Sequence, residues 1–295
     1  GVDNLPALLD TLAALPGENQ IAYRDGQRYA ARMTVYDQEP GQLIVPGESF
    51  QLKLSDYGID NLYLSPVKRR EPSAGEVEIQ VQAAGLNFRD TLTALGMLQE
   101  ATAAYGIHDA GDIPLGGECS GVVTAVGEGV GHLQVGDEVL TGFALGSLGS
   151  HVIARADLVY RRPEGMTPQE AATLPIAFLT AYYGLIRLAN LQPGERVLIH
   201  SAAGGVGQAA VQLAKRVGAE IYATASPGKW DFLREQGIDH IMNSRTLDFG
   251  QQIVEATGGQ GVDVALNSLT GDFIGASLDA LGENGRFIEM GKIGI

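Results

Sequence analysis

The sequence predicts an α/β fold in two parts: a β-rich domain, then a domain built on a doubly wound parallel sheet. Apolar and polar residues alternate through residues 49–84, most clearly at 76–81, and this period of two is typical of half-buried strands. Short apolar runs separated by glycine turns continue over residues 115–160. After Pro168, helix-like and strand-like segments alternate, which favours a parallel sheet with helices on both faces.

The first domain is expected to begin with two small elements. We expect residues 1–20 to form a helix-prone linker and residues 21–33 to form a hairpin that turns at Asp25-Gly26. The clearest strands after that are predicted at residues 122–127 and 137–140.

The boundary between the domains is placed near Pro175, where helix-and-strand alternation replaces the glycine-punctuated strands. This gives a first domain of residues 1–175 and a second of residues 176–295. Later strands of the second domain are predicted at residues 263–266 and 286–290.

A strand–turn–helix–strand unit over residues 196–225 organises the second domain. Its helix is predicted from apolar residues with a period of 3.6, namely Val206, Ala209, Ala210, Leu213 and Val217. The turn Ala202-Ala203-Gly204-Gly205-Val206-Gly207 matches the dinucleotide motif G-x-G-x-x-G, with Ala at the first position. Its glycines let the backbone approach a pyrophosphate at the helix N-terminus. A glycine-rich turn of an ordinary α/β protein is the alternative, and the flanking elements favour the nucleotide site.

The residues after the second strand of this unit indicate which dinucleotide is bound. An NAD site usually has a carboxylate there for the ribose 2′-hydroxyl, whereas this chain has Ser226-Pro227-Gly228-Lys229. A hydroxyl and a cation suit a 2′-phosphate, to which Arg245 could add a bidentate contact. The sequence therefore predicts NADPH; ordinary solvated charges at Lys229 and Arg245 are the alternative.

Composition limits the possible classes of function. A net charge of −15 argues against general binding to nucleic acid or anionic membranes, although the basic groups Lys68-Arg69-Arg70 and Arg161-Arg162 remain possible local patches. No signal peptide or membrane-spanning apolar run is found. The single cysteine, Cys119, excludes an internal disulfide and fits a cytoplasmic protein. Because the chain starts at Gly1 and stops just after a predicted strand, we expect it to be a piece of a longer chain.

Several phrases of the chain resemble one protein family. In order, they are Gly85-Leu86-Asn87-Phe88-Arg89-Asp90, Leu115-Gly116-Gly117-Glu118-Cys119-Ser120-Gly121, Val135-Gly136-Asp137-Glu138-Val139, Thr180-Ala181-Tyr182-Tyr183-Gly184-Leu185 and Asn267-Ser268-Leu269. With the glycine turn, they resemble the medium-chain dehydrogenase/reductase superfamily. Three further phrases, at 223–230, 244–249 and 289–292, resemble the enoyl reductase domains of modular type I polyketide synthases. The resemblance implies a GroES-like substrate domain, a Rossmann NADPH domain and an active site between them.

The resemblance points to the zinc-free branch of this superfamily. Zinc-dependent relatives use a thiolate and a histidine as ligands where this chain has Asn87-Phe88-Arg89-Asp90 and Glu118-Cys119. We therefore expect no metal site, and we expect Cys119 to pack as a small buried residue.

The implied reaction is hydride transfer from NADPH to the β-carbon of a 2-enoyl thioester, followed by protonation of the α-carbon. The implied partners are an acyl carrier protein, which holds the enoyl chain on phosphopantetheine, and the neighbouring synthase domains. Lys292 is the implied proton donor or enolate stabiliser, and Asn87 is the second catalytic candidate. The predicted cofactor contacts are Thr180, Ala203, Gly204, Gly205, Val206, Gly207, Ser226, Lys229, Arg245, Asn267, Ser268, Leu269 and Gly291.

Three departures from the family leave alternatives open. Leu98 stands where many relatives have a proposed proton-donating Tyr. The segment of residues 99–114 is longer than expected, and it is either a polar lid over the acyl chain or a surface loop. The Asp that partners the Lys in the family, and a segment that returns to the substrate domain, are expected beyond Ile295. There are three alternatives to an enoyl-thioester reductase. They are an enzyme whose enolate closes a cyclopropane-type ring, a stand-alone quinone reductase, and a scaffold that binds NADPH without turnover. Since carrier proteins are usually acidic, we also expect a local basic patch.

Overall fold

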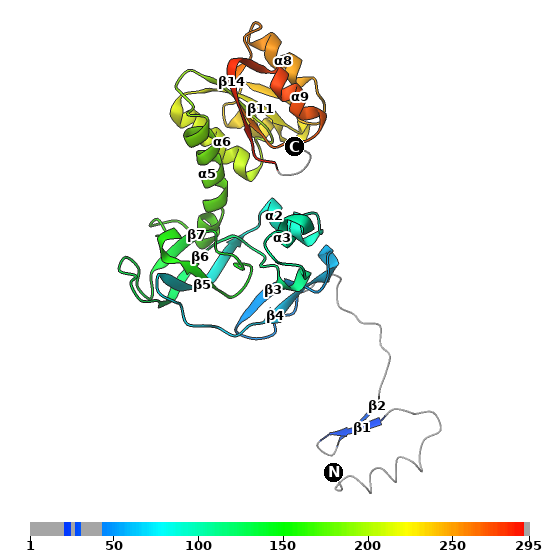
Figure 1. Cartoon of the computed structure of the whole chain (residues 1–295), viewed down its shortest axis with the longest axis vertical. Coiled ribbons are helices and arrows are strands. Elements are labelled where there is room, and N and C mark those ends of the chain that lie inside the picture. Colours follow the sequence, from blue (N-terminus) through cyan, green and yellow to red (C-terminus); the bar gives the residue numbers. More distant parts are fainter. Residues whose placement is uncertain (1–20, 25–26, 31–42, 292–295) are drawn as a thin grey trace. The chain divides into compact units, whose positions relative to one another are not determined.

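The computed structural model describes residues 21–24, 27–30 and 43–291, in two units (Figure 1). The smaller unit contains an antiparallel hairpin of β1 (Ile21–Arg24) and β2 (Gln27–Ala30), with Arg24 opposite Gln27. The predicted hairpin is thus confirmed. The predicted linker, residues 1–20, lies outside the described residues.

The first part of the larger unit is β-rich, as predicted. β3 (Phe50–Leu54) and β4 (Leu62–Pro66) form a two-stranded antiparallel sheet. A five-stranded antiparallel sheet has the order β8-β5-β6-β7-β9. Its strands are β5 (Glu76–Gly85), β6 (Glu118–Val126), β7 (Glu138–Gly142), β8 (His151–Arg155) and β9 (Val159–Arg161). Its core contains Val77, Ile79, Cys119, Val123, Val139 and Val152.

Short helices connect these strands and lead into the second part. α2 (Phe88–Ala94) and α3 (Gln99–Ala103) lie between β5 and β6 in the chain. Single 3-10 turns are formed by Ile59–Asn61, Ala110–Asp112, Ala156–Leu158 and Pro227–Lys229. α4 (Pro168–Ala172) begins with proline after a Thr167 cap, and α5 (Pro175–Tyr182) continues as a π-helix, Tyr183–Leu188. Proline suits a first helical position because its missing N–H has no intrahelical partner there.

The second part contains a parallel sheet of order β12-β11-β10-β13-β14. Its strands are β10 (Arg196–Ile199), β11 (Glu220–Ala225), β12 (His240–Asn243), β13 (Val262–Asn267) and β14 (Leu281–Glu289), all paired parallel. Its helices are α6 (Gly205–Val217), α7 (Trp230–Glu235), α8 (Phe249–Ala256) and α9 (Asp272–Asp279).

Side chains of β10 alternate between two apolar cores on opposite faces of this sheet. Val197 and Ile199 pack with residues of α5, α6 and α7, whereas Leu198 packs with Phe249 and Ile253 of α8. Figure 1 shows α6 on one face and α8 with α9 on the other. The sheet is therefore doubly wound, and the predicted fold class, a β-rich part followed by a doubly wound parallel sheet, is confirmed. Because residues 43–295 form one compact unit, the boundary near Pro175 stays a prediction.

Candidate active site

The strand order creates a candidate ligand-binding edge next to β10. β11 and β12 extend the sheet on one side of β10, and β13 and β14 extend it on the other. Ser201 follows β10, Ser268 follows β13, and their hydroxyls share a hydrogen bond of 3.3 Å. Ligands of open α/β sheets bind at such a switch point, outside the carboxyl ends of the strands.

The glycine turn lies at this switch point and is built by close backbone approach. A Cβ on Gly207 would lie 2.3 Å from the Ser201 carbonyl oxygen, so only glycine lets α6 pack against the turn. Gly205, the first residue of α6, is exposed, and a Cβ there would meet no atom within 4 Å. Ser201 has a φ of 51°, a left-handed conformation rare for serine. The predicted turn residues Ala203, Gly204, Gly205, Val206 and Gly207 thus surround one open helix N-terminus.

The residues predicted for a 2′-phosphate lie together along β11 and β12. Ser226 directly follows β11, and the backbone of Ser244, after β12, donates to the Ala225 carbonyl over 3.1 Å. Lys229 and Arg245 are both exposed, and neither forms an ion pair with a carboxylate of residues 43–291. This corner therefore combines a hydroxyl with two cations that are available to an anion.

Two residues on the other side of β10 form a network that the sequence did not predict. Asn267 is fully buried; its Nδ2 donates to Leu269 O over 2.8 Å and to Glu289 Oε2 over 2.6 Å. Glu289 Oε1 accepts from the backbone N–H of Gly291 over 2.5 Å. The polar side-chain atoms of Asn267 thus hold the loop itself, and Ser268, which is exposed, keeps its hydroxyl at the edge.

One predicted residue, Thr180, is not brought to this edge by the described contacts. Thr180 is half-buried on α5, which packs against α6. The predicted residue Lys292 lies outside the described residues, which end at Gly291, so its position stays a prediction.

Asn87 belongs to a separate network around Glu118, at the start of β6. Asn87 Nδ2 donates to Glu118 Oε1 over 2.8 Å, and the Ile176 N–H donates to Glu118 Oε2 over 2.7 Å. Burial raises the pKa of Glu118, against the opposing effect of these two donors. Sequence reasoning assigned no role to Glu118 or Glu289; their positions at the first residue of β6 and the last residue of β14 are the signal that could have found both.

His200 is a buried polar residue beside the turn. It is 1% exposed, and its Nδ1 and Nε2 share hydrogen bonds of 2.8 Å with the hydroxyls of Thr224 and Ser277, respectively. Burial lowers the pKa of His200 to about 4. This ring therefore joins β10, β11 and α9 beneath the candidate site.

The segment predicted as a lid is partly fixed. Leu98 precedes α3 and carries no proton donor. Tyr105 is 87% exposed, whereas Ala110 and Ile113 are buried, and Lys53 Nζ donates to Gly111 O over 3.1 Å. Only the first half of residues 99–114 thus remains a lid candidate.

The possible metal ligands and the single thiol can be located within the described residues. Across residues 43–291, no group of three or more His, Cys, Asp or Glu side chains could hold a metal ion. Cys119 is fully buried, as predicted, and burial raises its pKa to about 12. None of the helices in the described part has the length and apolar composition of a membrane span.

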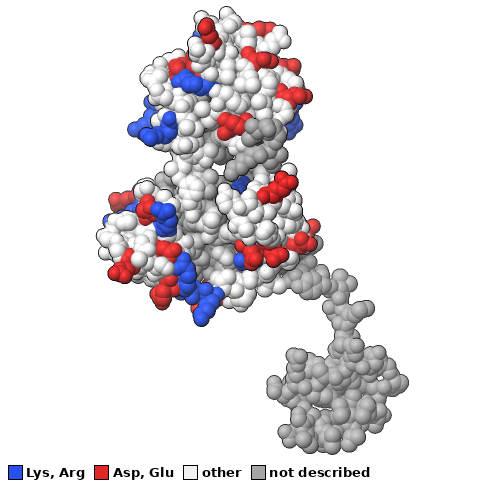
Figure 2. Space-filling view, viewed as in Figure 1, with Lys and Arg blue, Asp and Glu red and all other residues white. Residues whose placement is uncertain are grey.

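The basic groups named from the sequence are largely ion-paired. Arg69 and Arg70 pair with Glu78 and Glu76, and Arg161 and Arg162 pair with Asp137 and Glu138. Figure 2 likewise shows Lys and Arg in small groups beside Asp and Glu. The predicted basic patch for a carrier protein gains no support at these positions.

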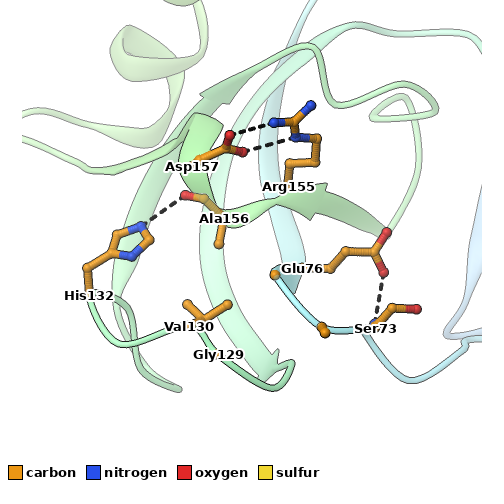
Figure 3. Close-up of a pocket in the computed structure, with 10 residues that line it drawn as sticks. Ser73, Glu76, Gly129, Val130, His132, Arg155, Ala156 and Asp157 are labelled. Atoms are coloured by element: carbon orange, nitrogen blue, oxygen red, sulfur yellow. Dashed lines mark hydrogen bonds and ion pairs between the residues drawn. The ribbon is translucent and has the colours of Figure 1, made fainter.

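Two surface pockets lie away from the glycine turn. One, of about 460 Å³, lies in the β-rich part (Figure 3), where Arg155 pairs with Asp157 and the His132 ring shares a hydrogen bond with Ala156 O. The other, of about 850 Å³, is lined by residues of α8 and α9, with the segments preceding them. Neither contains a predicted site residue.

Comparisons with known proteins cover both parts of the chain. The family model described as "Alcohol dehydrogenase GroES-like domain" matches residues 73–164, and the model described as "Zinc-binding dehydrogenase" matches residues 205–294. Mycoketide-CoA synthase of Mycobacterium tuberculosis (strain ATCC 25618 / H37Rv) is 44% identical over 290 residues, which is 96% of this chain. The spectinabilin polyketide synthase system protein NorB of Streptomyces orinoci is 45% identical over 291 residues, also 96% of this chain. The chain spans only 7% and 13% of the lengths of these two relatives, respectively.

The similar solved structures belong to a more specific group of enzymes than the family models describe. The CurK enoyl reductase is 56% identical with a TM-score of 0.83, over 84% of this chain and 76% of that chain. The CurF cyclopropanase of curacin A biosynthesis is 46% identical with a TM-score of 0.80, over the same shares. An NADPH complex of Escherichia coli quinone oxidoreductase is 31% identical with a TM-score of 0.72, over 81% of this chain and 72% of that chain. The chain therefore belongs to the enoyl reductases of polyketide synthases, within the medium-chain dehydrogenase/reductase superfamily.

Proposed function

We propose that this chain uses NADPH to reduce the α,β double bond of a 2-enoyl thioester held on an acyl carrier protein. The observation that carries the proposal is the 56% identity to the CurK enoyl reductase, which extends over both parts of the fold. Relatives that are polyketide synthases support a place in polyketide chain processing, with carrier protein and neighbouring synthase domains as partners.

The residues at the switch point fit NADPH. The exposed Gly205 leaves room beside the first N–H groups of α6, which favour a pyrophosphate through their hydrogen bonds and the helix dipole. Ser226, Lys229 and Arg245 offer a hydroxyl and two cations to a 2′-phosphate. NADPH bound there supplies the hydride from C4 of its nicotinamide.

The chain's own residues must then stabilise charge and supply a proton. Hydride addition places negative charge on the thioester oxygen, and a donor aimed at that oxygen lowers the barrier. Lys292 is the proposed donor, and Glu289 holds the preceding Gly291 by its backbone N–H. Because Leu98 has no exchangeable side-chain proton, the α-carbon proton must come from Lys292, from water or from another group.

The test is NADPH consumption with a short 2-enoyl pantetheine thioester, with mass spectrometry of the product. Loss of NADPH with a product heavier by one molecule of H₂ supports enoyl reduction, and a slower Lys292→Ala variant supports the role of that lysine. NADPH bound without turnover would instead favour a scaffold. Turnover of a quinone but of no enoyl thioester would favour a quinone reductase.

A second candidate function is reductive ring closure, in which the enolate displaces an internal leaving group. The 46% identity to the CurF cyclopropanase and the absence of a hydroxyl at Leu98 favour it. A 2-enoyl thioester with a halide at the γ-carbon separates the two functions. A halogen-free cyclopropane product supports ring closure, and a saturated product that keeps the halogen supports simple reduction.

A further inference from the structure

A buried carboxylate with no assigned role lies where three elements meet. Glu118 is 3% exposed, and its two oxygens accept hydrogen bonds from residues far apart in the chain. Asn87, in the loop between β5 and α2, donates from Nδ2 over 2.8 Å, and Ile176, in the first turn of α5, donates its backbone N–H over 2.7 Å. A single side chain thus joins that loop, β6 and α5.

Two glycines allow close packing around this carboxylate and its partner Ile176. A Cβ on Gly85 would lie 2.4 Å from Glu118 Oε1, and a Cβ on Gly117 would lie 3.0 Å from Ile176 Cδ1. Burying a carboxylate costs free energy that its hydrogen bonds must offset, and burial accordingly raises its pKa. The two donors are therefore necessary partners of this group rather than incidental neighbours.

Asp90 provides a second link between the same segments. Its Oδ2 accepts from the Asn87 backbone N–H and its Oδ1 accepts from the Gly116 N–H, each over 2.9 Å. Asn87 is thus held at its backbone by Asp90 and at its amide by Glu118. Both links lead to the segment that begins β6.

We propose that Glu118 is a positioning residue, which fixes the amide plane of Asn87 and fastens it to the start of α5, the helix that carries Thr180. This inference rests on the proposed function and on the role of Asn87 as the second catalytic candidate. A carboxylate only accepts hydrogen bonds, so it selects one orientation of the Asn87 amide. Without this contact the Asn87 side chain loses the acceptor that orients its amide nitrogen, and its alignment must be regained in every turnover.

The first test is Glu118→Gln, which keeps the size of the side chain but replaces one acceptor oxygen by a donor. We expect kcat to fall about tenfold, the effect of one hydrogen bond to a charged group, with the NADPH dissociation constant unchanged. Glu78→Gln is the matched control, because Glu78 is also 3% exposed and bonds Arg69 and Thr124 instead of Asn87. That variant should be less stable to heat and keep its kcat.

The second test is a double-mutant cycle with Asn87→Ala, which removes the amide that Glu118 is proposed to hold. If Glu118 acts through this amide, Asn87→Ala and the double variant Asn87→Ala/Glu118→Gln should have the same kcat. Thermal melts of all three variants separate a loss of kcat from a loss of folded protein.

Three results would overturn the proposal: an unchanged kcat in Glu118→Gln, an equal loss in Glu78→Gln, or a further loss of kcat when Glu118→Gln is added to Asn87→Ala. If the wild-type protein reduces no enoyl thioester, the proposed function is rejected, and this inference with it. NADPH binding is measured separately by fluorescence.

Discussion

Glu289 accepts a hydrogen bond from Asn267 over 2.6 Å and thereby fastens the end of β14 to the end of β13. The same carboxylate accepts from the Gly291 N–H, so one side chain orders both segments that leave the sheet on this side of β10. Asn267 is fully buried, and a buried donor that loses its acceptor costs about 1–3 kcal/mol.

Replacing Glu289 by glutamine should therefore lower both stability and activity. The glutamine amide has one acceptor oxygen for two donors, so in Glu289→Gln we expect the free energy of unfolding in urea to fall by about 1–3 kcal/mol and kcat to fall with it. Glu283→Gln is the control, because Glu283 is exposed on the same strand, β14. Equal stability and activity in the two variants would contradict the assigned role of Glu289.

Two glycines of the turn should respond oppositely to alanine. At Gly205 a Cβ meets no protein atom within 4 Å, so Gly205→Ala should keep its melting temperature and lose NADPH affinity. At Gly207 the Cβ would lie 2.3 Å from Ser201 O, so Gly207→Ala should unfold at a lower temperature. Thermal melts and NADPH fluorescence titrations measure both effects. Unchanged NADPH affinity in folded Gly205→Ala would place the pyrophosphate elsewhere.

Removing the cations after β11 and β12 should weaken NADPH binding selectively. For Lys229→Ala and Arg245→Ala we expect the NADPH dissociation constant to rise about tenfold each, the effect of a charge-assisted hydrogen bond, and the NADH constant to stay the same. Arg234→Ala, which removes a cation already paired with Asp231, should change neither. Equal losses for both cofactors would reject a 2′-phosphate site at this corner.

His200 should make stability depend on pH below neutrality. Its folded pKa of about 4 lies below the ordinary value near 6.5, so between these values the unfolded chain binds a proton that the folded chain excludes. Stability from this group is complete above about pH 6.5 and falls as the pH is lowered, by about 2 kcal/mol between pH 7 and pH 5.

Urea unfolding of the wild type and His200→Gln at both pH values isolates this contribution. The variant retains polar contacts but has no ionisable ring, so its stability should fall less than that of the wild type over the interval. Parallel losses in the two proteins would show that other groups cause the acid sensitivity.

Local sequence patterns were enough to predict those parts of the candidate site that consist of a turn or of residues directly after a strand. The turn at residues 202–207 and the positions of Ser226 and Ser268 follow from strand ends, and parallel strands end at one edge. The buried Cys119 and the hairpin at residues 21–30 followed from composition and alternation, and the structure confirms both.

Long-range partners could not be predicted in this way. The Ile176 N–H donates to Glu118 from 58 residues away, and Asn267 donates to Glu289 across 22 residues. Both hydrogen bonds depend on how the strands and helices pack. Lys53, likewise, fixes Gly111 across 58 residues, and so part of the predicted lid belongs to the packed body. All the predicted cofactor contacts, those of Thr180 and Asn267 included, stay predictions.

The order β12-β11-β10-β13-β14 divides the candidate site into two separate sets of residues. Ser226, Lys229 and Arg245 follow strands on one side of β10, whereas the loop at residues 267–269 and Gly291 follow strands on the other. Mutations in the first set, which should change cofactor preference, should therefore have effects independent of mutations in the second set, which should change the chemistry. A designer of hybrid synthases can vary the two in independent libraries and recombine the best variants at β10.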